Sequence, residues 1–437
     1  MGDLTVPPAG SDWPLSRGRA WSVSLAGTLT MAVSYVDRQA LAALAPTVTR
    51  ELAISDPAYG WLQAAFSLAY LVAAPLAGRW VDRAGARLAL FAAVLVWSVV
   101  AASHALVPGY AALFALRILL GLAEAPSFPG AAQTVQRVLP PPDRAAGFGV
   151  LFTGSSVGAA VAPPLAVALA GRFGWRLSFV GTSLAGLLWL PLWWWATRPR
   201  EVRALLDRRG APNVSRAAPS PFRLARHPAV LRAMAVVVAT SPALAFLLLW
   251  GAKLLVALFG MSQAETARYL WFPPLCFDAG SVLFGALATR VDRRHWAAPQ
   301  RLDTPHRGLF ALALLLTAGL ALVPFARTPW EAMGCGGLAM AGGGGLLALL
   351  TSDMLARVPQ EAISTASGVT AAAQSAAYIV ANPLIGFAVK RTGSYRPAIF
   401  GLAAWLLPGC LTWLLWRPPP RVVRAEGPPR EEHAEES

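Results

Sequence analysis

The sequence is poor in charged residues and in the side chains that build metal and disulfide sites. Only 14% of its 437 residues are charged, whereas about a quarter are charged in a typical soluble domain. Its three cysteines and five histidines are scattered and follow no metal-ligand spacing. We therefore expect neither a soluble enzyme nor a disulfide scaffold, and we expect no metal centre and no cofactor.

Acidic residues and lysine are also scarce. The chain has 22 acidic residues against 37 lysines and arginines, for a net charge of +15, and only Lys253 and Lys390 are lysine. Such an excess of basic residues is common in nucleic-acid-binding proteins. Here, however, 56% of the residues are hydrophobic, and the arginines separate long apolar runs instead of lining one face. We therefore expect no nucleic-acid partner and infer a protein that lies in a lipid bilayer.

Long apolar runs recur along the whole chain. A helix needs about 20 apolar residues to cross the hydrocarbon core of a membrane. We count about twelve such stretches, at 19–43, 57–80, 87–106, 109–135, 144–170, 174–196, 229–258, 263–290, 307–325, 329–355, 361–390 and 394–417. The sequence therefore predicts an all-α membrane protein with twelve transmembrane helices.

The two halves of the chain resemble each other. Pro164 and Gly174 in the first half match Pro383 and Gly393 in the second half at one common offset. We therefore expect two pseudo-symmetric six-helix bundles, and parallel halves of this kind characterise one large transporter architecture. A binding site is then expected near the middle of the membrane, between the halves.

The arginines also divide the chain and orient it. We expect an N-terminal tail at 1–18, a first six-helix bundle at 19–196, a basic linker at 197–228, a second bundle at 229–417 and a disordered tail at 418–437. Loops rich in arginine face the cytoplasm, so the linker and both termini are expected there. Heavy use of Ala, Gly, Pro and Arg suggests a GC-rich bacterial genome, and hence a multi-pass protein of the inner membrane.

Four ionisable residues lie deep inside predicted spans of the first half. Asp37 and Arg38 belong to the first span, and Arg117 and Glu124 to the fourth. Each costs roughly 2.5–3.5 kcal/mol on insertion scales, so function is the default interpretation. Arg117 and Glu124 are two helical turns apart and can face one cavity. The alternative is an ion-pair cluster that only joins spans 1 and 4.

This combination of residues suits an organic anion. An arginine fork can hold a carboxylate through two hydrogen bonds. A buried acid can gain and lose a proton during a transport cycle. A protonated acid leaves arginine free for the substrate, whereas an ionised acid competes for it. We therefore expect a small organic anion and a proton as partners.

Weaker candidates for substrate contacts lie in other spans. Tyr70 could donate a hydrogen bond or simply pack, and Asp278 could be functional or structurally paired, with Lys253 as one possible partner. The remaining candidates are Ser155, Gln374 and Ser375. A charged segment from Gly78 to Arg87 follows the second span, and we expect it to form a tight loop that clamps helix ends. Its candidate gating residues are Gly78, Asp82, Arg83, Gly85 and Arg87.

At these residues the chain resembles known transporters. The Gly78–Arg87 segment is similar to the signature loop of the major facilitator superfamily. The runs Tyr35–Arg38 and Arg117–Pro129 resemble the anion:cation symporter family of that superfamily. The resemblance implies proton coupling at Asp37 and Glu124. It implies substrate binding at Arg38, Arg117 and Tyr70, and we add Tyr35 to the candidates from the same motif.

Within this family, the chain looks most like the hexuronate branch. Lys253 and the run Phe277–Gly280 are among the matching positions. Other positions depart from the pattern, because Met340, Ala341 and Leu346 stand where that branch tends to carry polar residues. The second half of the cavity is therefore expected to be unusually apolar. This leaves an aromatic or short aliphatic acid as an alternative cargo.

Three other classes of membrane protein were weighed. A drug-exporting proton antiporter usually carries a Gly-Pro motif in span 5, and the motif is incomplete at Gly158 and Pro163–Pro164. A receptor would need a signalling domain, and a membrane enzyme would need a set of catalytic residues. The leading hypothesis is a monomeric, proton-coupled importer of an organic monocarboxylate, with sugar acids first.

Overall fold

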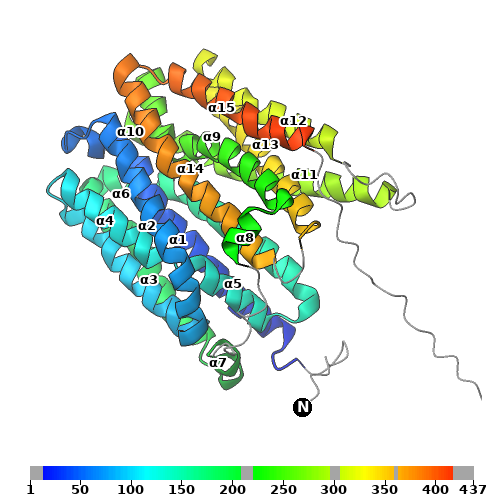
Figure 1. The fold of residues 1–437 in the computed structure, drawn as a ribbon. Coiled ribbons are helices and arrows are strands. Elements are labelled where there is room, and N and C mark those ends of the chain that lie inside the picture. The colour runs from blue at the N-terminus through cyan, green and yellow to red at the C-terminus, as the bar shows by residue number, and fades with distance from the viewer. Residues whose placement is uncertain (1–12, 208–219, 296–305, 359–362, 417–437) are drawn as a thin grey trace, which may run out of the picture.

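The computed structural model describes residues 13–207, 220–295, 306–358 and 363–416, and the regular structure in these ranges is helical without strands (Figure 1). The first half contains α1 (Arg17–Glu51), α2 (Asp56–Ala84), α3 (Ala86–Ser103), η1 (His104–Leu106), α4 (Tyr110–Glu124), α5 (Ser127–Val138), α6 (Pro141–Ala196) and α7 (Arg200–Leu206). The second half contains α8 (Pro221–Ala225), α9 (Pro228–Phe259), α10 (Gln263–Leu270), α11 (Phe272–His295), α12 (Arg307–Ala318), η4 (Gly319–Phe325), α13 (Pro329–Leu355), α14 (Ile363–Thr392) and α15 (Arg396–Leu415). The tail at 418–437 and most of the N-terminal tail lie outside the described residues.

These helices form the twelve expected spans. Nine helical stretches of the described chain are long and apolar enough to cross a membrane, and one of them, Gly147–Ala196, is long enough for two spans. Gly174 divides that stretch, because its φ of 81° breaks the helix. Helices α1 and α2 complete the set with a more polar composition. The prediction of an all-α membrane protein with twelve transmembrane helices is confirmed.

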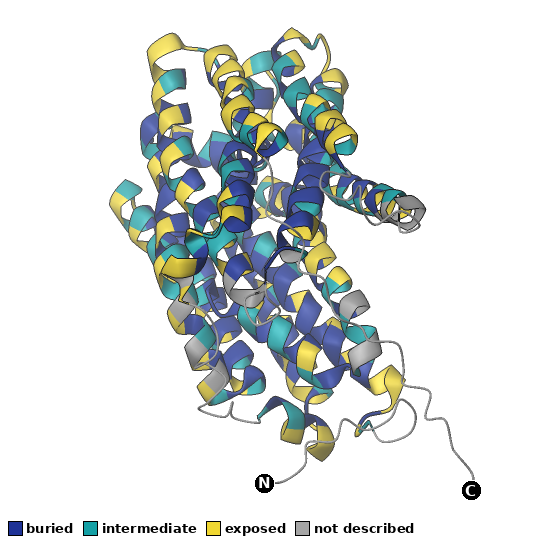
Figure 2. Cartoon of the chain, turned by 45° about the vertical axis from the view of Figure 1, so that its right-hand side comes forward, coloured by how far each residue is buried: buried dark blue, intermediate teal, exposed yellow. Residues whose placement is uncertain are grey.

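The two halves form separate bundles that lie side by side, blue to cyan and green to red in Figure 1. The internal repeat is visible in the backbone, since Gly393 has a φ of 65° at the position that matches Gly174. In the membrane-spanning bundle, large apolar side chains such as Leu188 and Leu415 are exposed. Exposed residues follow the outer faces of the helices in Figure 2. An apolar rim of this kind suits contact with lipid.

The spans alternate in direction, so the bundle has two distinct ends. We call the end that carries α7, α8 and Gly85 the linker end. The opposite end carries the connections around Glu51–Asp56, Gly174 and Gly393, and we call it the short-loop end.

The two halves touch closely at the short-loop end, where α2 and α14 pack backbone to backbone. A Cβ atom added to Gly60 would lie 2.3 Å from the carbonyl oxygen of Asn382. One added to Gly386 would lie 2.3 Å from the carbonyl oxygen of Asp56. Real Cβ atoms do not approach backbone this closely, so only glycine fits at either position.

The segment that was expected to form a tight loop after the second span is mostly helical. Residues Gly78–Ala84 are the last turns of α2, and Gly85 alone interrupts the helix before α3 begins. Gly85 has a φ of 82°, which favours glycine. A Cβ atom there would also lie 2.7 Å from the carbonyl oxygen of Leu206 in α7. The expectation of a loop was wrong because an alternation of charged and small residues does not by itself end a helix.

Candidate functional site

The deepest charged contact joins α1 to α4. Arg38 Nε donates a hydrogen bond of 2.5 Å to Glu124 Oε2, and Ser34 Oγ donates to the same oxygen at 2.8 Å. Glu124 is fully buried, and its other oxygen, Oε1, has no hydrogen-bond partner among the described residues. The predicted proximity of spans 1 and 4 is therefore observed as an ion pair.

Aromatic rings surround the Arg38 guanidinium. Its central carbon lies 5.0 Å from the ring centre of Tyr35, 4.8 Å from that of Phe66 and 4.9 Å from that of Tyr70. The faces of aromatic rings attract cations, and this attraction is larger where water is excluded. The rings thus help to hold a charged arginine inside the membrane without neutralising it.

Arg117 of α4 lies beside this pair but has a different partner. Its Nη2 donates to Gln63 Oε1 at 3.1 Å, and its guanidinium lies 4.9 Å from the Phe66 ring centre. Arg117 is 2% exposed, and neither Nε nor Nη1 has a hydrogen-bond partner among the described residues. Buried donors of this kind are costly unless a partner arrives. Arg117 therefore has two N–H groups, on Nε and Nη1, that could donate hydrogen bonds to an anion.

Asp37 is buried on another face of α1. Neither of its carboxyl oxygens makes a hydrogen bond that meets distance and angle criteria within the described chain. The carboxyl group lies close enough to Glu124 for electrostatic repulsion and close to the indole of Trp97. Two acids that repel each other in a buried site are a suitable place for a proton.

Small residues allow the helices of this site to approach one another. A Cβ atom on Gly121 would lie 2.5 Å from the carbonyl oxygen of Phe66, so α4 packs directly on α2. A Cβ atom on Gly158 would lie 2.2 Å from the carbonyl oxygen of Ala32, so α6 packs directly on α1. These two contacts bring α2 and α6 against the two helices, α4 and α1, that carry Arg117, Glu124 and Arg38.

The expected residues outside this cluster have other surroundings. Gln374 donates to Ser241 within the second half, and Ser375 donates to the backbone of its own helix. Ser155 is half-buried. Asp278 accepts a hydrogen bond of 2.7 Å from Ser156 of the first half.

Lys253 does not bond to Asp278. It donates to Asp56 of α2 instead, because α9 carries it toward the short-loop end.

Several residues near the cluster were missed in the sequence. Ser34 and Gln63 bond to Glu124 and Arg117, and Phe66 lies beside both arginines. Tyr378 of α14 lies close enough to Tyr35 and Arg38 for electrostatic interaction, so the second half also reaches the site. A search at one helical turn from each buried charge would have found Ser34, whereas Tyr378 carries no such signal.

Two of the five expected gating residues, Gly85 and Arg87, approach the linker. Arg87 Nε donates to both carboxylate oxygens of Asp207, at 3.1 and 3.0 Å, and Trp193 Nε1 donates to the Arg87 carbonyl. Arg83 is exposed, and an added Cβ atom on Gly78 would meet nothing. The side chain of Asp82 lies outside the described residues. In the part that the structure describes, this segment therefore attaches α3 to the end of the first bundle.

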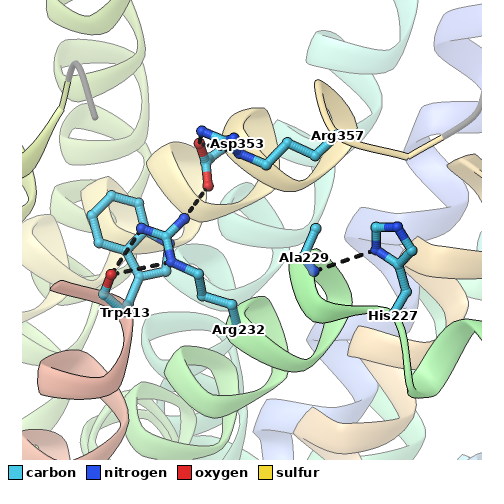
Figure 3. Close-up of polar contacts among 6 residues, drawn as sticks. All are labelled: His227, Ala229, Arg232, Asp353, Arg357 and Trp413. Atoms are coloured by element: carbon cyan, nitrogen blue, oxygen red, sulfur yellow. Dashed lines mark hydrogen bonds and ion pairs between the residues drawn. The ribbon is translucent and has the colours of Figure 1, made fainter. Parts of the chain in front are cut away.

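A second buried charge cluster lies at the linker end of the second half (Figure 3). Asp353 accepts hydrogen bonds from Arg232 and Arg357, and Arg232 also donates to the carbonyl of Trp413 at 2.8 Å. Nearby, His227 Nδ1 accepts from the Ala229 backbone at the start of α9. This cluster joins α9, α13 and α15.

Metal ligands do not gather in the described residues, where no group of three or more His, Cys, Asp or Glu side chains could hold an ion. All three cysteines are free.

Comparisons with known proteins agree with the fold described above. The sequence profile of the Major Facilitator Superfamily matches residues 27–375. The hexuronate transporter of Escherichia coli (strain K12) is 26% identical over 94% of this chain and 97% of its own length. The galacturonate transporter of Dickeya chrysanthemi is 24% identical over 73% of this chain and 95% of its own length. The hexuronate transporter of Bacillus subtilis (strain 168) is 36% identical over 37% of this chain and 38% of its own length.

A solved structure shares the fold. The crystal structure of a bacterial homologue of the human lysosomal transporter Spinster, inward-facing and unoccupied, superposes with a TM-score of 0.73. It is 19% identical and covers 92% of this chain and 97% of that chain. The resemblance indicated by the sequence motifs is confirmed. Because the superfamily profile spans most of the chain and the twelve-helix fold agrees with it, this chain belongs to the Major Facilitator Superfamily.

Proposed function

We propose that this chain is a secondary transporter that carries a sugar acid, with a hexuronate as the leading cargo, together with protons across a bacterial inner membrane. The named relatives are transporters of hexuronates and galacturonate. The buried arginines supply the chemistry that a carboxylate needs. On this proposal the chain is a carrier and not an enzyme, and it acts as a monomer.

One observation supports the mechanism above the others. Glu124 holds Arg38, while Arg117 beside it has two unpaired donors. Protonation of Glu124 removes its negative charge and weakens its hold on Arg38. Arg38 and Arg117 then bind the carboxylate of the cargo together, with Tyr35 and Tyr70 beside it. Loss of the proton lets Glu124 reclaim Arg38, and the cargo leaves.

Asp37 is proposed as the second proton-carrying group. It is buried next to Glu124 and makes no ion pair among the described residues. Ionisation of both Asp37 and Glu124 at once is unfavourable, because the two carboxylates repel each other and are buried away from water. A proton can therefore stay on one of them while the other pairs with Arg38.

The direction of the chain in the membrane follows from its arginines. The linker at 197–228 is rich in arginine, and such segments remain in the cytoplasm. We therefore place the linker end and both termini in the cytoplasm, and the short-loop end outside. The domain boundaries follow from the same assignment.

A less hydroxylated acid is the second candidate cargo. Met340 and Leu346 are buried apolar residues of α13 at positions where the hexuronate branch tends to carry polar side chains. An aromatic or short aliphatic acid would leave fewer hydroxyl groups without partners in such a surrounding.

Uptake into proteoliposomes tests the proposal. Labelled galacturonate is supplied with and without an inward proton gradient, and unlabelled acids compete in parallel. Accumulation that depends on the gradient is the expected result. Uptake of an aromatic or aliphatic acid alone would keep the mechanism and change the cargo. Correctly folded protein that transports no carboxylate would overturn the proposal.

A further inference from the structure

One hydrogen bond between the two halves has an acid as its acceptor, although a neutral side chain could accept the same bond. Ser156 Oγ in α6 donates to Asp278 Oδ1 in α11 at 2.7 Å. Asp278 lies near the middle of the span formed by α10 and α11. A carboxylate at this depth is costly. A neutral acceptor such as asparagine would serve the same bond at lower cost.

The other deep acid of the second half shows what a structural carboxylate looks like. Asp353 is held by two buried arginines, Arg232 and Arg357, so its charge is balanced. Asp278 makes no ion pair among the described residues, and the donor that it has there is one hydroxyl group. Asp278 is also half-buried, so the residue is not fully enclosed by the described chain. An ionised carboxylate accepts up to about four hydrogen bonds and donates none.

Asp278 reaches the first half close to the charged site. Ser156 lies two residues before Gly158 on α6. A Cβ atom on Gly158 would lie 2.8 Å from the Cβ atom of Tyr35, so α6 contacts α1 at the residue that flanks Arg38. Two residues of α-helix rise only about 3 Å. The carboxylate of Asp278 therefore meets the first half within about one helical turn of the contact with Tyr35, the residue that flanks Arg38.

We propose that Asp278 is the residue that selects hydroxylated cargo, and that the Ser156 hydroxyl occupies the position of a cargo hydroxyl. This inference rests on the proposed function. The arginines of the first half hold the carboxylate of the cargo, and Asp278 in the second half accepts hydrogen bonds from its hydroxyl groups. A cargo that binds both halves in this way also draws them together.

Selection follows from the cost of an unpaired acceptor. A sugar acid replaces the Ser156 hydrogen bond with its own. An unhydroxylated acid that fills the same space leaves a charged carboxylate without a donor, and sites of this type reject such analogues strongly. Met340 and Leu346 of α13 are apolar and accept no hydrogen bond from a hydroxyl group, which leaves this role to Asp278.

The test compares galacturonate with cyclohexanecarboxylate, which has a carboxyl group on a six-membered ring and no hydroxyl groups. Wild-type chain, Asp278→Ala, Asp278→Asn, Ser156→Ala and the control Glu331→Gln are reconstituted in proteoliposomes. Glu331 is an exposed acid in the same half. Transport efficiency is measured for galacturonate, and inhibition constants are measured for cyclohexanecarboxylate.

We expect Asp278→Ala to lower transport efficiency for galacturonate at least about tenfold, from the strength of hydrogen bonds to charged groups. Inhibition by cyclohexanecarboxylate should stay the same or become stronger. The transport efficiency of Asp278→Asn for galacturonate should lie between those of the wild-type chain and Asp278→Ala. Asp278→Asn serves as the decisive variant if the alanine variant does not fold. Ser156→Ala should keep galacturonate uptake, since the cargo supplies the donor.

Two results would overturn the inference. One is an equal loss for both ligands in the Asp278 variants. The other is a Ser156→Ala variant that behaves like Asp278→Ala, because both results describe a structural bridge between the halves. Absence of galacturonate transport in the wild-type chain is a different outcome, and it would reject the proposed function itself.

Discussion

Lys253 of α9 and Asp56 of α2 form an ion pair of 2.5 Å across the interface between the two halves. The ammonium group also lies 5.0 Å from the ring centre of Tyr59, whose hydroxyl donates to the carbonyl of Leu249. Trp250 adds a hydrogen bond to Asn382 of α14 at the same end. The contacts of Lys253 and Tyr59 join the two halves at the short-loop end, and the Trp250 bond holds α9 to α14 within the second half.

Breaking this pair should favour opening of the short-loop end. In Lys253→Gln, Asp56 loses its charged partner across the interface, so the closed arrangement becomes less stable. Spin labels at Arg172 and Arg327, both exposed near this end in different halves, report the separation. We expect a longer mean distance in Lys253→Gln than in the parent chain.

A charge exchange provides the control for this prediction. The double variant Asp56→Lys with Lys253→Asp restores opposite charges and should restore the short distance. Identical distance distributions in all three chains would show that the pair does not hold the end closed.

Neutralising Glu124 should separate accumulation from exchange. Glu124→Gln keeps the size of the side chain but cannot release a proton or pair ionically with Arg38. Proton-driven accumulation of galacturonate should be lost, while exchange of internal for external substrate continues. Both activities are measured on the same proteoliposomes, with Glu331→Gln as the control. Unchanged accumulation would refute the role of Glu124.

Replacing Arg117 by lysine should weaken substrate binding. Lysine keeps the positive charge but loses the planar fork that matches a carboxylate. We expect the KM for galacturonate to rise at least about tenfold, with a smaller change in kcat. Calorimetric titration of detergent-solubilised protein measures the same loss as an increase in Kd. A KM equal to that of the parent chain would argue against contact between Arg117 and the carboxylate.

The cluster in Figure 3 should contribute stability. Asp353→Ala leaves Arg232 and Arg357 buried without their acid, and removal of one partner from a buried ion pair costs roughly 3–5 kcal/mol. The expected result is a clear fall in Tm in detergent.

Arg17→Ala is the matched control for that measurement. Arg17 pairs with Asp143, but its side chain is 76% exposed, so the loss should be about 0–1 kcal/mol. Equal falls in Tm for the two variants would contradict the structural interpretation of Asp353.

The sequence predicted those features that the free-energy cost of burying polar groups or the repetition of apolar runs constrains. Twelve apolar stretches predicted the spans because the membrane leaves few alternatives to a helix. The pairing of Arg38 with Glu124 was predictable, since buried charges rarely remain alone. In the same way, the matching positions of Gly174 and Gly393 indicated an internal repeat, and both glycines have a positive φ in the structure.

Contacts between distant helices were not predictable in this way. Asp278 was the partner considered for Lys253, whereas the fold brings Lys253 to Asp56 at the start of α2. Gln63 and Tyr378 are neutral residues, and nothing in their local sequence distinguishes them from residues that merely pack. Helix ends were uncertain for a related reason, because α2 continues through Gly78 and ends only where Gly85 adopts a positive φ.

The glycine contacts between α2 and α14 imply that close backbone packing, as well as the ion pair of Lys253 with Asp56, holds the two halves together at the short-loop end. Gly60 and Gly386 each face a backbone oxygen at a spacing that excludes any side chain. One methyl group, added as Gly60→Ala, would act as a wedge between the two halves while every charged group stayed in place. The balance between the two arrangements of the carrier would then shift toward the one that is open at the short-loop end. The absence of a side chain at these two positions therefore lets the two halves meet at the short-loop end.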